Sequence, residues 1–130
     1  LDQVYRFVIV VCVSKKDIEK IITQIEKQIE VIAAFFHTDQ ETIFQESALY
    51  KVKSKSLFEE RHIQNIIKNS HAKIVTVSPE FFVIEKTGFR EETERLYRDL
   101  APYGLLQFVR SGRISVTKEP LNITEILKDK

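Results

Sequence analysis

The stretch KIVTVSPEFFVIEKTG, Lys73–Gly88, carries the clearest folding signal in the chain. Two runs rich in β-branched and aromatic residues, KIVTVSPE and FFVIEKTG, follow each other directly, and Pro79 ends the first of them. Strands joined this tightly pair antiparallel, because parallel neighbours need a crossover of about a dozen residues or more. We therefore expect a β-hairpin over this stretch.

A helical pattern lies on each side of the hairpin. Ser56 and Glu59 form an S-x-x-E capping box, which predicts the start of a helix that ends near Asn69 or Ser70. A second helix is predicted over residues 90–101, with acidic residues in its first turn and a Pro and a Gly beyond its end. The apolar positions that we expect these helices to bury are Phe58, Ile63, Ile66, Ile67, Leu96, Tyr97 and Leu100.

Two further strands complete the pattern. Ala48–Ser54 alternates apolar and polar residues, and LLQFVRSGRISVTK, Leu105–Lys118, is predicted to be one long strand. The order from Ala48 onward is therefore strand, helix, strand, strand, helix, strand. This is the ferredoxin-like βαββαβ plan of an α+β domain, which places two helices on one face of a four-stranded sheet. The polar segment Asp39–Glu46 in front of it is typical of a link between units.

The N-terminal part of the chain predicts a smaller strand, helix, strand unit. Val4–Val13 is rich in β-branched residues, Ser14 is a suitable cap for a helix over about Lys15–Gln28, and Val31–Thr38 is a second short strand. Such a unit has too few strands to be stable alone. We expect it either to associate with a partner or to be the second half of a larger unit.

Composition narrows the classes of function. The chain has 130 residues and a net charge of +1, which argues against a strong electrostatic grip on nucleic acid or on an anionic membrane. No apolar run approaches the ~20 residues that would span a bilayer, and no secretion signal is visible. We therefore expect a cytoplasmic protein. The single cysteine, Cys12, lies within an apolar strand and is interpreted as a buried small hydrophobe.

No catalytic or metal-binding pattern is evident. The G-x-S-x-G, G-x-x-x-x-G-K and G-x-G-x-x-G motifs are absent, and His37, His62 and His71 lack the close pairing typical of a zinc site. The carboxylates fall on polar helix faces beside lysines. Phe81 and Phe82 raise the possibility of RNA bases stacked on a ferredoxin-like sheet, but the RNA-recognition signature is missing, which favours a packing role for these rings.

The Arg-Ser-Gly-Arg stretch, Arg110–Arg113, interrupts an otherwise apolar strand. A glycine inside a strand marks a bulge or the close approach of another backbone or ligand. Two neighbouring arginines can hold a carboxylate or phosphate bidentately, and they can equally be solvated charges on a kinked edge strand. Local physics leaves these alternatives open.

The hairpin, the second helix and the last strand together resemble the C-terminal domain of the acetolactate synthase (acetohydroxyacid synthase) small subunit. That family shows A-x-I-x-x-V-x-P, then V-I-E-x-T-G, and, after a helix, F/Y-G-I/L-L-x-x-V-R-[ST]-G-R. The matching positions are Ala72, Ile74, Val77, Pro79, Val83, Ile84, Glu85, Thr87, Gly88, Tyr103, Gly104, Leu106, Val109, Arg110, Gly112 and Arg113.

The resemblance continues upstream. Glu46–Val52, E-x-A-L-Y-K-V, is similar to the family's entry into this domain, and residues 4–38 resemble the second half of its N-terminal ACT domain. Phe89 departs from the family, which often has Thr or Ser there as a helix cap. The resemblance implies a partial ACT domain with its link over 1–45 and a ferredoxin-like domain over 46–130. It also implies a fragment that begins midway through the ACT domain, an expectation supported by the absence of Met.

The resemblance implies a regulatory subunit without chemistry of its own. Its partners would be the catalytic large subunit, a second copy of the chain and a branched-chain amino acid effector such as valine. Thiamine diphosphate, magnesium and FAD would belong to the catalytic partner. The effector residues are expected largely outside this chain, and Arg110, Gly112 and Arg113 are the predicted contacts with another chain. A ferredoxin-like nucleic-acid-binding module and a stand-alone amino-acid-sensing domain remain as alternatives.

Overall fold

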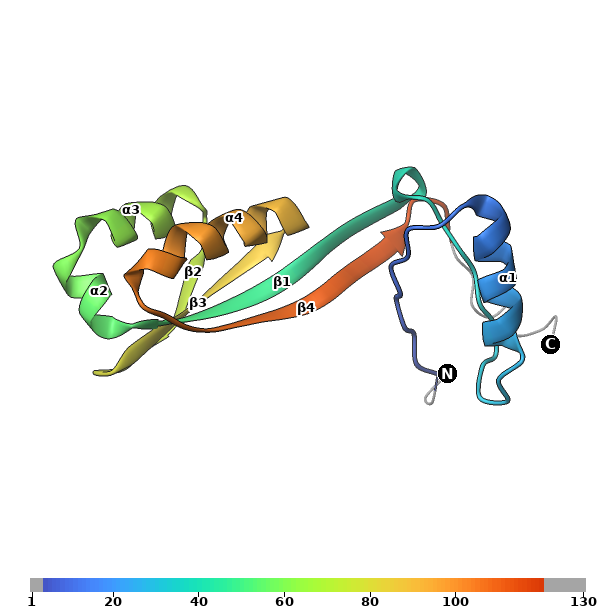
Figure 1. The fold of residues 1–130 in the computed structure, drawn as a ribbon, viewed down its shortest axis with the longest axis horizontal. Coiled ribbons are helices and arrows are strands. Elements are labelled where there is room, and N and C mark those ends of the chain that lie inside the picture. The colour runs from blue at the N-terminus through green and yellow to red at the C-terminus, as the bar shows by residue number, and fades with distance from the viewer. Residues whose placement is uncertain (1–3, 121–130) are drawn as a thin grey trace. The chain divides into compact units, whose positions relative to one another are not determined.

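A computed structural model describes residues 4–120 of the chain (Figure 1). It divides into two compact units, Phe44–Ile114 on the one hand and Leu1–Ile43 with Ser115–Lys130 on the other, which we describe separately. Residues 121–130, LNITEILKDK, whose pattern predicts a short helical or frayed tail, lie outside the described residues. The helices are α1 (Lys15–Glu26), α2 (Ser54–Glu59), α3 (Arg61–Asn69) and α4 (Arg90–Leu100), and the strands are β1 (Thr42–Lys53), β2 (Lys73–Val77), β3 (Phe81–Gly88) and β4 (Leu105–Thr117).

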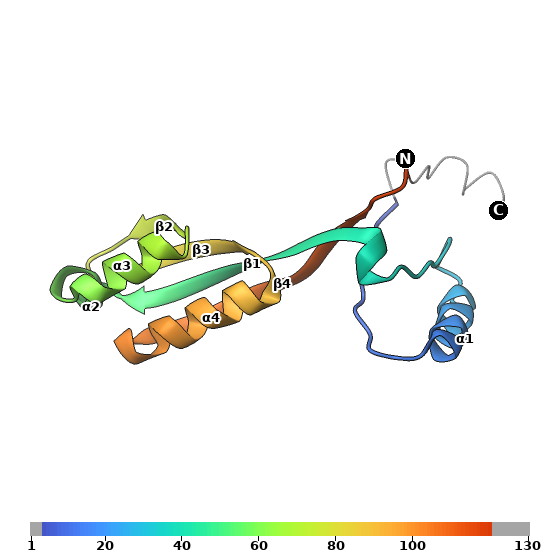
Figure 2. The ribbon, with the colours of Figure 1, turned by 90° about the horizontal axis from the view of Figure 1, so that it is seen from above.

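The Phe44–Ile114 unit has the predicted ferredoxin-like α+β architecture. Its four strands form one sheet in the order β2-β3-β1-β4. The hairpin prediction is confirmed, because β2 and β3 pair antiparallel, with Ile74 opposite Ile84. β1 also pairs antiparallel with β3, and Tyr50 lies opposite the same Ile84. Helices α2, α3 and α4 all cover one face of this sheet, as both ribbon views show (Figure 2).

The core lies between that sheet face and the helices. From Glu46 to Val52 every second residue of β1 is buried, as a strand covered on one side requires. Helices α3 and α4 close the core because each presents one apolar stripe to the sheet. The buried apolar residues are Ala48, Tyr50, Val52, Ile63, Ile67, Phe82, Ile84, Leu96 and Leu100.

Several sequence-based expectations about this unit are wrong. The predicted first helix is broken at Glu60, whose extended backbone separates α2 from α3. Ser56 does not cap it, because its hydroxyl donates instead to the carbonyl of Tyr103 at 2.5 Å. Two side chains that were expected to be buried are exposed: Phe58 is 73% exposed, and Tyr97, which packs on Phe108 at the edge of the core, is 41% exposed. The expected link also ends earlier than predicted, since β1 already begins at Thr42 and gains hydrogen bonds from a neighbouring strand.

The other unit, which we call the N-terminal unit, contains α1, and this helix starts where the sequence predicts. Ser14 caps it by accepting a hydrogen bond from the Asp17 N–H at 3.3 Å. The predicted strands over 4–13 and 31–38 are not formed in the single chain, where both segments are irregular. The physical reason is that a strand exists only when a neighbour takes its backbone hydrogen bonds. No described residue of this unit is buried, and Cys12 is exposed rather than buried.

No helix among residues 4–120 combines the length and the apolar character needed to cross a bilayer.

Candidate functional site

Arg110 is engaged inside its own unit. Its Nη2 and Nε donate to the Glu46 carboxylate oxygen Oε1 at 2.6 and 3.0 Å, and its Nη1 reaches Glu94 Oε1 at 3.4 Å. Only 24% of the Arg110 side chain and 9% of the Glu46 side chain are exposed. Burial alone would lower the pKa of Arg110, but the two carboxylates raise it overall and keep the guanidinium charged.

A buried polar network extends from this ion pair into the core. The hydroxyl of Thr93 donates to the same Glu46 carboxylate. The carbonyl of Thr93 accepts a hydrogen bond from the Tyr50 hydroxyl at 2.5 Å. Burial raises the pKa of the Tyr50 phenol above its ordinary value of 10.0. The network therefore ties β1, α4 and β4 together with no buried side-chain polar atom of the described residues left without a partner.

Gly112 has an unusual backbone conformation inside β4. Its φ of +76° lies in the left-handed region, which glycine adopts without the strain that a Cβ would bring. A Cβ at this position would meet nothing within 4 Å, so close approach of another part of the chain does not explain the glycine. Next to it, Ser111 Oγ accepts the Ser47 N–H at 3.0 Å, which satisfies a backbone donor of β1.

Arg113 lies over an aromatic pair beside the start of α4. Its guanidinium is 3.9 Å from the ring centroid of Phe44, a cation–π contact. The Phe44 ring in turn meets Phe89 edge-on at 5.7 Å between centroids. Phe89 therefore contributes packing instead of a polar side-chain cap, and the Glu92 carboxylate accepts the Phe89 N–H at 2.7 Å.

The structure thus gives each predicted site residue an intrachain role. Sequence analysis allowed Arg110 either to bind a carboxylate or phosphate or to be a solvated charge. In the structure it binds a carboxylate, and that carboxylate belongs to Glu46 of the same chain. Sequence reasoning missed Glu46, although its place in the E-x-A-L-Y-K-V motif was a usable signal. Contact of Arg110, Gly112 and Arg113 with another chain stays a prediction.

The unit also has a shallow open pocket of about 370 Å³ between α2, α3 and β2. Its walls are mostly apolar, and the amide of Gln64 is already used by the carbonyl of Leu57 at 2.9 Å. Lys68 is its one charged residue, so it holds no acid–base pair. Within residues 4–120 no cluster of three or more His, Cys, Asp or Glu side chains could hold a metal ion.

Comparison with known proteins identifies this architecture. The family described as small subunit of acetolactate synthase matches residues 45–119. The acetolactate synthase small subunit of Mycolicibacterium smegmatis is 36% identical over 118 residues, which cover 91% of this chain and 69% of that protein. The Bacillus subtilis small subunit is 34% identical over 98 residues, or 75% of this chain and 56% of that protein.

The likeness extends to three dimensions. The crystal structure of the acetolactate synthase small subunit from Thermotoga maritima superposes with a TM-score of 0.71 at 25% sequence identity. The superposition covers 85% of this chain and 68% of that one. Sequence and structure therefore agree over most of the described residues, and the chain belongs to the family of acetolactate synthase small subunits.

Proposed function

We propose that this chain regulates a catalytic large subunit of acetolactate synthase. It would bind that subunit, raise its activity and confer feedback inhibition by valine or another branched-chain amino acid. The observation that carries the proposal is the family match over residues 45–119, because a small subunit implies a large one. The polar network of Arg110 supports a non-catalytic role for its charged residues, since each is used to hold the fold.

A homodimer is part of this proposal. The N-terminal unit exposes large apolar side chains, with Tyr5, Phe7 and Ile9 between 70% and 84% exposed. Apolar surface of this extent marks a site of association. A second copy would cover it if residues 4–13 and 31–38 of the two chains paired as strands, which would also satisfy their backbone groups.

The division of chemistry between subunits follows. Thiamine diphosphate, magnesium and FAD would be held by the catalytic subunit, and this chain would act on it only through contacts. An effector inhibits when it binds one state of the complex better than another, and a coupling of about 1–3 kcal/mol is typical. The same coupling acts in reverse, so binding of the large subunit would change the affinity for the effector by the same factor.

The test is acetolactate formation from pyruvate by the large subunit of the same organism, with this chain titrated in. Saturable activation is the expected result. Valine is then added at each ratio of the subunits. Activation with valine sensitivity supports both parts of the proposal, and activation without it supports the regulatory role and places the effector residues elsewhere. A chain that neither activates nor binds the large subunit would refute the proposed function.

A further inference from the structure

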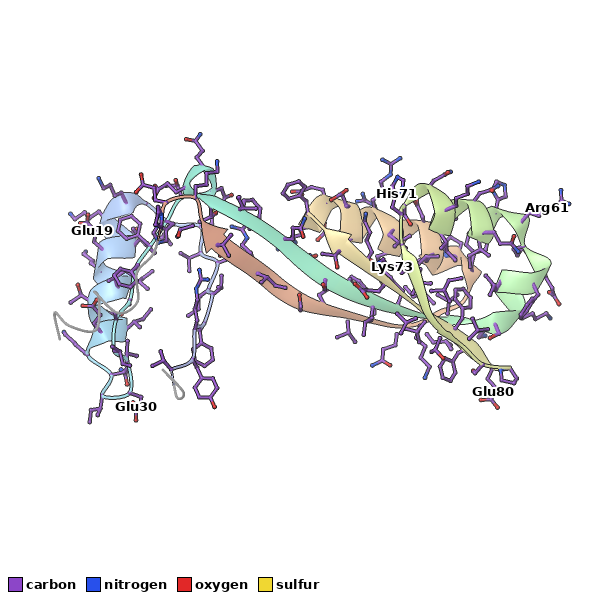
Figure 3. All side chains as sticks on the ribbon, turned by 180° about the vertical axis from the view of Figure 1, so that it is seen from behind. Glu19, Glu30, Arg61, His71, Lys73 and Glu80 are labelled. Atoms are coloured by element: carbon purple, nitrogen blue, oxygen red, sulfur yellow. The ribbon has the colours of Figure 1, made fainter. Side chains whose placement is uncertain are left out.

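One face of the sheet in the Phe44–Ile114 unit carries no element of that unit. Helices α2, α3 and α4 all lie on the other face (Figure 2). Figure 3 shows side chains that project from the sheet on the side away from the helices. Strand alternation identifies them: Leu49 and Lys51 lie between the buried residues of β1, so they point away from the core.

The centre of this face is apolar. Leu49 is 45% exposed, and Val109 on β4 is 49% exposed. Val109 follows Phe108, which stacks on buried Tyr50 at 4.9 Å, so the two β4 residues point to opposite faces. Val83 on β3 lies opposite Lys51 and belongs to the same face. These three side chains form a small patch across three neighbouring strands.

Lysines surround the patch. Lys51 and Lys53 share the phase of Leu49 on β1, and Lys73 of β2 lies opposite Glu85, which is itself opposite Leu49. The Lys51 Nζ is 4.5 Å from the ring centroid of Phe81, so its charge is held over the sheet. With three lysines and one glutamate, the face is positive. We call Leu49, Val83, Val109, Lys51, Lys53 and Lys73 the open face.

This charge decides which partner fits. A second copy docked face to face would bring two sets of three lysines together, and like charges at an interface are unfavourable. An acidic surface with an apolar centre would complement both features. We propose that the open face docks on such a surface of the catalytic subunit, an inference that rests on the proposed regulatory function.

The experiment compares two double charge reversals in the full chain. K51E/K73E changes the open face, whereas K55E/K68E makes the same change of net charge on α2 and α3. Both variants are first checked for an unchanged far-UV spectrum and thermal unfolding. The affinity for the large subunit is then measured by titration at several salt concentrations.

We expect K51E/K73E to raise Kd about tenfold or more and to weaken its salt dependence, while K55E/K68E binds like the unaltered chain. Equal binding by both variants and the unaltered chain would overturn the open face as the docking site and leave the regulatory function standing. The K51E/K73E chain could instead change its oligomeric state in the absence of the large subunit and keep the same Kd for that subunit. This result would assign the open face to a second copy and would also overturn the proposal. Failure of the unaltered chain to bind would refute the regulatory function itself.

Discussion

The ion pair of Glu46 and Arg110 makes an asymmetric prediction about stability. The variant R110M removes the guanidinium but keeps an apolar stem, and E46Q removes the negative charge but keeps an oxygen that can accept a hydrogen bond. The two leave different charges behind. R110M leaves a carboxylate that is only 9% exposed, whereas E46Q leaves a guanidinium that is 24% exposed and still 3.4 Å from Glu94.

The magnitude follows from this difference in burial. Removing one partner of a fully buried ion pair costs about 3–5 kcal/mol, because the remaining charge is uncompensated. For R110M we expect about 3 kcal/mol, the lower end of that range, because Thr93 still donates to Glu46. For E46Q we expect about 1–2 kcal/mol, since water and Glu94 still stabilise Arg110. Removing both charges should cost less than the sum of the single changes.

The assay is urea unfolding of the unaltered chain, the two single variants and the double variant E46Q/R110M, followed by far-UV circular dichroism. The double-mutant cycle isolates the coupling between the two side chains. We expect a coupling of about 1–3 kcal/mol. A cost of R110M within about 0.5 kcal/mol of zero, the range of ordinary surface changes, would refute the assignment of a buried ion pair.

Three further predictions concern the same unit. G112A should lower the free energy of unfolding by about 1–2 kcal/mol, because alanine is strained at a φ of +76° although it has space there; an unchanged urea midpoint would contradict the left-handed backbone at this position. Burial raises the pKa of the Tyr50 phenol, so the neutral phenol contributes its full stabilisation of the fold below pH 10.0. This stabilisation is lost as the pH rises beyond that value. The free energy of unfolding should thus fall above pH 10.0, and it should fall less in Y50F. Urea unfolding of both proteins at several pH values measures this difference. E92Q should weaken the start of α4 by about 0.5–1 kcal/mol, and E91Q, next to it, serves as the control in thermal unfolding.

Local pattern was sufficient for most elements of the Phe44–Ile114 unit. The hairpin of β2 and β3, helix α4 and the long strand β4 all lie where alternation, helical spacing and helix-ending residues predict them. These signals are readable because each depends on residues that are near in sequence. The break between α2 and α3 was missed because Glu60 carries no Gly or Pro signal, and tertiary contacts such as that of Ser56 decide it.

The N-terminal unit shows the opposite case. The β-branched run Val4–Val13 predicts a strand, but the single chain provides no neighbour for it. Intrinsic β-propensity depends on packing and pairing, so it does not form a strand without them. The propensity therefore indicates segments that form strands only beside a partner strand, which the proposed homodimer would supply.

The sequence by itself determined the α+β class, the chain order of the strands and most helices of the Phe44–Ile114 unit, and the family. Only the tertiary structure decided what the Arg-Ser-Gly-Arg stretch does, since Glu46 is 64 residues from Arg110 and no local period links them. It also showed that Gly112 adopts a left-handed backbone conformation with open space around its Cα. The physical reason is that propensity and periodicity act over a few residues, whereas ion pairs and sheet faces are made by segments that meet only after folding.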